Sequence, residues 1–188
     1  MNITTLLYPT FFLTQLYALT YHFYQPHTGS SSPTKQRLVI LISITLGLLS
    51  TFSPPCTNPL TSYPSTTCLL LSESLFLWTA LTTRPRRFAV IFAQVQPQYV
   101  ASTGPFAYIR HPTYVSYALG WLGVSLSVVG AVLWRLAAFV CLGVLLSLYA
   151  DAAELEERQF LDEGTEAEVR AEYGAYMRRT RRWLPGVN

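Results

Sequence analysis

Gly-Pro-Phe-Ala-Tyr-Ile-Arg-His-Pro-Thr-Tyr, residues 104–114, is a polar segment between two strongly apolar regions of the chain. It places one guanidinium, one imidazole and two phenols within residues 108–114. Proline fixes its own φ angle and disfavours helix at the preceding residue, so Pro105 and Pro112 predict a shaped loop leading into a helix near Tyr114. Polar groups beside a bilayer are costly unless they bind something. This loop is therefore the first candidate for a functional site.

Downstream of the loop, residues 114–150 carry a single charge, Arg135. An α-helix rises about 1.5 Å per residue, and about 20 apolar residues cross a bilayer. The stretch is too long for one transmembrane span. It fits two spans that turn near Gly130.

Upstream of the loop, three further apolar segments are predicted, at residues 3–24, 38–52 and 68–83. Residues 25–37 and 53–67, which are polar and proline-containing, predict the loops between them. The second segment is short for a span, and Glu73 inside the third is either a functional charge or a sign that the segment does not cross fully. No helix is predicted for residues 88–103.

After residue 150 the composition changes to Glu, Ala and Arg. Thr165-Glu166-Ala167-Glu168 has the pattern of a capping box and predicts a last helix over residues 166–179. The apolar residues of this helix recur at helical spacing and form one stripe, made of Val169, Tyr173, Tyr176 and Met177. The sequence therefore predicts a C-terminal amphipathic helix.

Basic residues are concentrated at three points of the sequence, which are residues 35–37, 84–87 and 178–182. If the apolar segments alternate across a membrane, these points fall on one side, and positive charge predicts that this side is cytosolic. The loop at residues 104–114 and the last helix are predicted on the same face. The expected fold is a single-domain, all-α, polytopic transmembrane bundle of about five spans over residues 1–188.

Composition agrees with a membrane protein and excludes some functions. The 188 residues are 51% hydrophobic and only 12% charged, which is low for a soluble domain. The net charge of +3 comes from separate clusters rather than a basic stripe, so nucleic-acid binding is not predicted. The cysteines lack metal-site spacing and the histidines are scattered, so no metal site is predicted.

Three parts of the chain resemble, in order, the motifs of the isoprenylcysteine carboxyl methyltransferases, a family of integral membrane enzymes. They are the loop at residues 104–114, the acidic run Glu154-Leu155-Glu156-Glu157, and the tail at residues 176–185. The resemblance spans about residues 77–185, and three motifs in order are more specific than any one of them. Together with the three apolar segments upstream, it divides the single domain into three N-terminal membrane segments (residues 1–83) and an expected catalytic core (residues 84–188).

The resemblance also implies an activity. The cofactor would be S-adenosylmethionine, and the acceptor would be the carboxylate of a C-terminal prenylcysteine on CaaX-processed proteins. The enzyme would be a multi-pass protein of the endoplasmic reticulum membrane in contact with membrane lipid. A carboxyl group has a pKa of about 4, so the acceptor is ionised at neutral pH and needs no general base. Transfer then depends on in-line positioning and the exclusion of water.

Site residues follow from the same resemblance. The implied cofactor-binding residues are Gln98, Tyr99, Val100, Ala101, Phe106, His111, Pro112, Thr113, Tyr114 and Glu156. Aromatic rings can face a sulfonium, and Glu156 can meet an ammonium group. Arg110 is the expected catalytic residue and a clamp for a carboxylate of the cofactor or the acceptor, and Arg179 is a second substrate-binding residue.

Two positions depart from the family pattern and keep other hypotheses open. Phe106 stands where the family often has tyrosine, and Ala152 stands where it carries an arginine that contacts the substrate. The alternatives are a phospholipid or other lipid methyltransferase, a sterol reductase of related architecture, and a catalytically silent membrane relative. Glu156 and Glu157 could instead form a solvated helix face, and residues 178–182 could anchor lipid headgroups.

Overall fold

The computed structural model describes residues 3–17, 23–24, 32–53, 59–83, 88–89, 91–93 and 96–183. The helices in this part of the chain are α1 (Ile3–Tyr17), α2 (Pro33–Thr51), α3 (Pro59–Thr83), α4 (Pro112–Ser127), α5 (Val132–Leu161) and α6 (Ala167–Arg179). A 3-10 turn, η2 (Gly104–Ala107), precedes α4, and two-residue strands β1 (Phe23–Tyr24) and β2 (Phe88–Ala89) pair in parallel. The predicted all-α class is confirmed, with this short strand pair as an addition.

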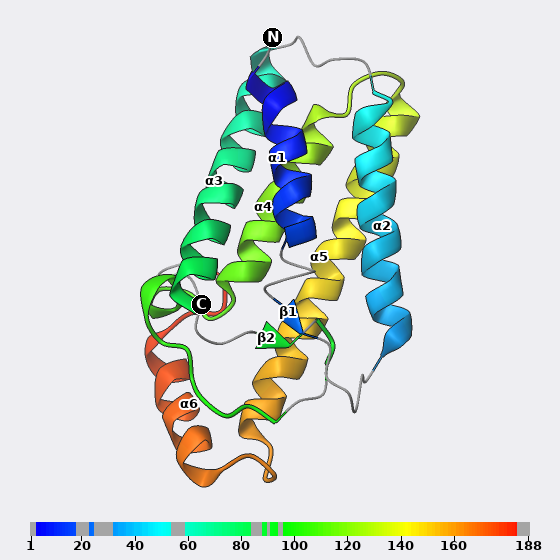
Figure 1. Ribbon diagram of the computed structural model, residues 1–188. Helices are drawn as coiled ribbons and strands as arrows, with labels where there is room; N and C mark the ends of the chain where they lie inside the picture. Colours follow the sequence, from blue (N-terminus) through cyan, green and yellow to red (C-terminus); the bar gives the residue numbers. More distant parts are fainter. Residues whose placement is uncertain are drawn as a thin grey trace.

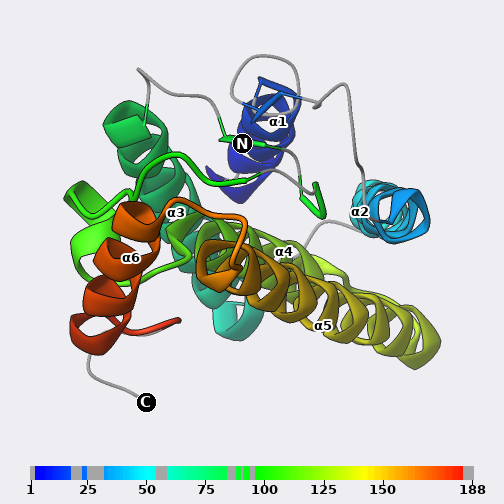
Figure 2. The same ribbon diagram turned by 90° about the horizontal axis from the view of Figure 1, so that it is seen from below.

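The first five helices run alongside one another along the long axis of the molecule, and α6 lies at the lower end (Figure 1). The last turns of α5 extend below the other helices and contact α6 there. Viewed from below, α6 lies beside the lower ends of α3 and α5 (Figure 2). Among the helices, α3 packs most extensively against α4. The loop at residues 96–111 therefore lies at the end of the bundle that α6 covers.

Two boundaries in the N-terminal half differ from the prediction. The helix predicted over residues 3–24 is too long, because Phe23–Tyr24 pair with Phe88–Ala89 as a strand. The loop predicted over residues 25–37 is also too long, because α2 begins at Pro33. Ser32 caps this helix by accepting a hydrogen bond from the backbone N–H of Lys35 at 3.3 Å. Proline is tolerated in the first helical turn, where no N–H is required.

The loop predicted over residues 53–67 is wrong in its second half, where α3 begins at Pro59. Ser65, one of the polar side chains of this stretch, faces α4. Ser65 is fully buried and donates to the carbonyl of Gly123 at 2.7 Å. Two helical turns further on, Ser72 donates to the carbonyl of Ser116 at 2.7 Å. Hydroxyl bonds between helices are typical of membrane bundles, so here the polar composition belongs to a helix interface.

The segment after the loop forms two helices, α4 and α5, as predicted, and the turn between them contains Gly130 at a φ of 117°. The end predicted at residue 150 is wrong, because α5 continues to Leu161. No helix is present over the described residues of 88–103, also as predicted. Of the described helices, α5 is the one that is long and apolar enough to cross a membrane by length and composition.

The C-terminal helix is also confirmed, beginning one residue later than predicted. The predicted stripe is its inner face, with Val169, Tyr173 and Tyr176 buried. The capping box does not form. Thr165 Oγ1 instead donates to the carbonyl of Gln159 at 2.7 Å, at the end of α5, which fixes the turn between the two helices.

The outer surface of the bundle is apolar on several helices. Large hydrophobic side chains are exposed along α2, α3 and α5, among them Ile40, Leu41, Ile44, Leu48, Leu70, Leu71, Leu77, Leu81, Leu133, Leu136 and Val140. Apolar surface of this extent marks contact with lipid or with another protein.

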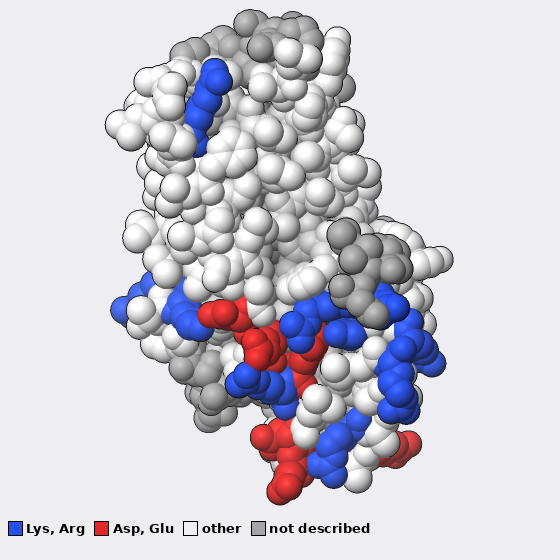
Figure 3. Space-filling model, turned by 180° about the vertical axis from the view of Figure 1, so that it is seen from behind, with Lys and Arg blue, Asp and Glu red and all other residues white. Residues whose placement is uncertain are grey.

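Most charged side chains, in contrast, are concentrated toward one end of the molecule (Figure 3). At that end Lys35, near the start of α2, forms a 2.6 Å ion pair with Asp151 of α5. Arg135 lies in the first turn of α5, at the opposite end of that helix. The molecule therefore has an apolar body and one charged end, and the loop at residues 104–114 belongs to the charged end.

Candidate functional site

The loop at residues 104–111 is held by the chain that follows α6. The backbone N–H of Arg110 donates to the carbonyl of Arg181 at 2.7 Å, within a parallel bridge between Ile109 and Arg181. The hydroxyl of Tyr176, on α6, donates to the carbonyl of Phe106 at 2.7 Å. Two motifs that are far apart in sequence therefore form one structural unit.

The carboxylate of Glu157, near the end of α5, is the centre of the site. It accepts hydrogen bonds from Arg110 Nε at 2.9 Å and from Arg182 Nε at 3.0 Å, and it also pairs with Arg182 Nη2. His111 Nε2 lies 3.0 Å from the same carboxylate. Because Glu157 is only 4% exposed, it is not part of a solvated helix face. Three side chains from the loop and the tail thus converge on one buried acid.

His111 lies between two carboxylates. Its Nδ1 is 3.4 Å from Glu156 Oε2, and its Nε2 faces Glu157. Burial alone would lower the pKa of His111, but the hydrogen bonds to these two carboxylates and their negative charges outweigh burial and raise the pKa above 6.5. The site therefore favours the protonated imidazolium, in which each ring nitrogen can donate a hydrogen bond to a carboxylate.

Tyr114 and Glu156 extend the cluster toward the bundle. The Tyr114 hydroxyl donates to Glu156 Oε1, and the Tyr114 ring stacks on His111 and on Tyr149 with centroid distances of 5.8 Å and 5.6 Å. Pro112 is the buried first residue of α4, which fixes where the helix that carries Thr113 and Tyr114 begins. The Glu156 side chain remains 38% exposed, so one carboxylate of the site is accessible.

Other predicted site residues lie outside this cluster. Val100 is buried against Val169, Tyr173 and Tyr176, so this residue anchors the segment 98–101 to α6. Within that segment Gln98 is exposed, and Tyr99 and Ala101 are half-buried. Arg179 is exposed, with its guanidinium 5.9 Å from the Tyr176 ring centroid. Ala152 is fully buried in the core of the bundle.

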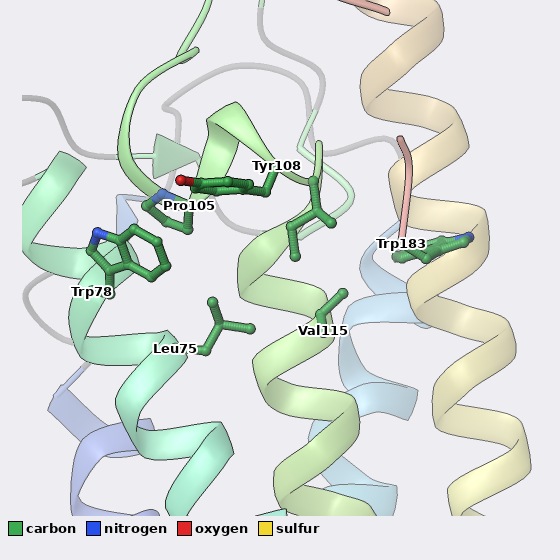
Figure 4. Close-up of a pocket in the computed structure, with 7 residues that line it drawn as sticks. Leu75, Trp78, Pro105, Tyr108, Val115 and Trp183 are labelled. Atoms are coloured by element: carbon green, nitrogen blue, oxygen red, sulfur yellow. The ribbon is translucent and has the colours of Figure 1, made fainter. Parts of the chain in front are cut away.

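An apolar cavity of about 350 Å³ adjoins the cluster. Its lining residues come from α3, the loop, α4 and the tail, and they are Leu75, Trp78, Pro105, Tyr108, Ile109, Val115 and Trp183 (Figure 4). The ring centroid of Trp183 is 5.6 Å from that of His111. This tryptophan therefore lines the cavity and also packs on the polar cluster.

Sequence reasoning missed the central place of Glu157 and the roles of Arg182 and Trp183. In the sequence, Glu157 is only one member of an acidic run, and Arg182 is only one member of a basic cluster. Their pairing depends on α6 reversing the chain, which no local pattern expresses. One sequence signal points to the pairing of Glu157 with Arg182: the acidic run and the tail carry opposite charges. A buried acid requires a partner, and the tail can supply one.

No curated protein and no solved structure matches the chain. A family model for the isoprenylcysteine carboxyl methyltransferase (ICMT) family matches residues 66–162, which include most of α3, the loop, α4 and α5. The match covers more than half of the chain and contains Arg110, His111, Glu156 and Glu157. The match includes the first two motifs, and it shows that the chain belongs to the isoprenylcysteine carboxyl methyltransferase family.

Proposed function

We propose that the protein is a protein-S-isoprenylcysteine O-methyltransferase, which uses S-adenosylmethionine to methylate the C-terminal carboxylate of prenylated, CaaX-processed proteins. The main support is the junction of a charged cluster around Glu157 with an apolar cavity lined by Trp183. A prenylcysteine acceptor has a carboxylate next to a long apolar chain, so it requires a charged surface beside an apolar cavity. Family membership supplies the reaction class.

The proposed location is the endoplasmic reticulum membrane, with α1 to α5 as five spans and α6 on the cytosolic face. Exposed apolar side chains along α2, α3 and α5 support contact with lipid, and the collection of charge at one end supports the assignment of that end to the cytosol. Two helices are short, since α1 has 15 residues and α4 has 16. Tilting and local thinning of the bilayer accommodate short spans at modest cost.

The residues of the site fit S-adenosylmethionine. The half-exposed Glu156 carboxylate is suited to its ammonium group. The rings of Tyr114 and Trp183, which both pack on His111, are suited to face a cation. The segment 98–101 offers backbone groups for the nucleoside, together with Gln98. When bound, the cofactor supplies a methyl group on a positively charged sulfonium, which is already a strong electrophile.

The chain's own contribution is positioning. His111 has a carboxylate at each ring nitrogen, so it orients Glu156 and Glu157 and is not free to act as a general base. A carboxylate acceptor needs no base, because it is ionised at neutral pH. An amine acceptor has to lose a proton, so the fixed imidazole favours the acid over a phospholipid amine. Arg110 holds the loop to Glu157 and to the tail, and thereby shapes the cavity wall at Ile109.

The deciding experiment is radiolabelled methyl transfer in membranes that contain the protein. We expect transfer to N-acetyl-farnesylcysteine and none to phosphatidylethanolamine. Donor binding, measured by calorimetry on the detergent-solubilised protein, separates the alternatives. Transfer to the phospholipid would support a lipid methyltransferase, and the absence of both transfer and donor binding would support a catalytically silent relative.

A further inference from the structure

We infer that Arg182 binds the carboxylate of the acceptor, while the acceptor's apolar tail occupies the cavity that Trp183 lines. The inference rests on the proposed function, because it assumes an acceptor with an acid at the end of a lipid. It assigns a binding role to one particular arginine of the tail motif, which the sequence alone does not distinguish from its basic neighbours.

The other cations of the cluster are already satisfied by protein groups. The Arg110 side chain is only 11% exposed. Its Nε donates to Glu157, and its Nη1 donates to the carbonyls of Met177 and Thr180 at the end of α6. His111 has a carboxylate at each ring nitrogen. Neither side chain can turn toward a ligand without leaving a buried group unpaired, which is costly.

Arg182 differs from them in exposure and in its remaining donors. Its side chain is 37% exposed. Nε and Nη2 bond the Glu157 carboxylate, and within the described part of the chain Nη1 donates to no protein group. A guanidinium has five N–H donors in a planar fork, so one edge can bond Glu157 while the outer edge, Nη1 and Nη2, accepts a second carboxylate. Glu157 then acts as the fixed anchor that orients this outer edge.

In the chain, Arg182 lies next to a residue that lines the cavity, so the proposed binding edge and the apolar lining belong to adjacent residues. The next residue, Trp183, lines the cavity together with Ile109, and Ile109 precedes Arg110 in the loop. The bridge between Ile109 and Arg181 holds the tail against the loop at this point. In Figure 4 the side chains that line the cavity extend from Trp78 on α3, past Val115 on α4, to Trp183. An elongated apolar tail lying along this line would end beside the residue that precedes Trp183.

The test compares two ligands that differ only in charge, N-acetyl-farnesylcysteine and its carboxamide, binding to the detergent-solubilised full chain. A charge-assisted hydrogen bond predicts that the wild type binds the carboxylate at least about tenfold more tightly than the carboxamide. Arg182→Gln should abolish this preference, because the outer edge of the guanidinium is lost. Arg178→Gln removes the same charge from the exposed end of α6 and should keep the preference. Donor affinity, measured in parallel, verifies that each variant is folded.

A second measurement uses the wild type alone, in case Arg182→Gln does not fold. An arginine-selective dicarbonyl reagent, read by mass spectrometry, should modify Arg182 more slowly when the carboxylate ligand is present, and the carboxamide should protect it less. Equal binding of the two ligands by the wild type, a preference that persists in folded Arg182→Gln, or equal protection by both ligands would overturn the inference. Methyl transfer is measured separately. If the wild type transfers the methyl group but Arg182→Gln leaves the carboxylate preference unchanged, the proposed function stands and the inference fails. If the wild type prefers the carboxylate but transfers no methyl group, the proposed function fails and Arg182 remains the acid-binding residue.

Discussion

Arg110 Nε and Glu157 Oε1 lie 2.9 Å apart, although the two residues are separated by 47 positions in the sequence. Both side chains are almost fully enclosed, at 11% and 5% exposure. Arg110 lies in the loop between η2 and α4, and Glu157 lies near the end of α5, so their ion pair joins the two helices of the hairpin at the charged end. Arg182 and His111 bond the same carboxylate, which makes Glu157 the point where all three motifs meet.

Glu157→Gln should destabilise the protein strongly. The substitution removes the charge that compensates the buried guanidinium of Arg110, and breaking one partner of a buried ion pair costs about 3–5 kcal/mol. Glu154→Gln, on the same helix, is the matched control, because Glu154 forms an exposed i,i+4 pair with Arg158 that is worth about 0.5 kcal/mol or less. Unfolding by denaturant in detergent measures both. Equal losses for the two variants would contradict the central place given to Glu157.

The pH dependence of stability should carry a contribution from His111. Its folded-state pKa is raised above the unfolded value of 6.5, so the protonated ring contributes stability that is fully present below pH 6.5. That contribution is lost as the pH rises through the folded-state pKa. The groups that surround the ring are Glu156, Glu157, Tyr114 and Trp183, with Arg110 and Arg182 behind Glu157.

The measurement is the free energy of unfolding between pH 6 and pH 9 for the wild type and for His111→Gln. The arginines keep their charge over this range, so the difference between the two profiles isolates the imidazole. We expect the wild-type advantage to shrink toward alkaline pH. An advantage that grows with pH would mean that the ring is held neutral in the folded protein.

Glu156→Ala should weaken binding of S-adenosylmethionine. If the half-exposed carboxylate pairs with the ammonium group of the donor, its loss should lower affinity by about tenfold or more. His111→Ala should also weaken binding, because the ring orients Glu156. Glu154→Ala, which removes a carboxylate from an exposed position two residues away, should leave the affinity unchanged. Calorimetry on the solubilised protein decides, and unaltered binding in both site variants would show that the donor lies elsewhere.

Gly120→Ala should loosen the packing of α4 against α1. A Cβ atom at Gly120 would lie 2.1 Å from Cε2 of Phe11 and 2.8 Å from the hydroxyl of Ser72, so the helices would have to move apart. Forcing extra volume into a packed core costs about 1–3 kcal/mol. Gly143→Ala is the control, since a Cβ at Gly143 would meet nothing within 4 Å. Thermal inactivation in detergent should be faster for the first variant only, and equal rates would argue against the close contact.

Part of this arrangement was already determined by local sequence. The apolar stretch that contains only Arg135 as a charge predicted two helices and their turn near Gly130, because the length of an apolar run and the presence of a glycine are local properties of the sequence. The stripe of Val169, Tyr173 and Tyr176 predicted the buried face of α6 for the same reason. Helical periodicity and turn preferences are properties of a single segment, so they can be predicted from the sequence without knowledge of the segments that pack against it.

The errors arose where a partner changes the meaning of a residue. Ser65 and its neighbours looked like a polar loop, yet they form the first turns of α3, because the carbonyl of Gly123 on α4 accepts the Ser65 hydroxyl. The first segment looked helical through residue 24, yet Phe23–Tyr24 pair with a strand more than sixty residues later. Local composition does not record such partners.

The sequence alone determined that the protein is helical and apolar with a charged segment after residue 150, and it pointed to the loop, the acidic run and the tail as candidate functional motifs. Tertiary structure alone decided how those motifs combine. It buried Glu157, aligned Arg110, His111 and Arg182 on it, and set Trp183 between the charges and the cavity. The physical reason is that a buried carboxylate is tolerated only when cations are delivered to it, and only the return of the chain through α6 delivers Arg182.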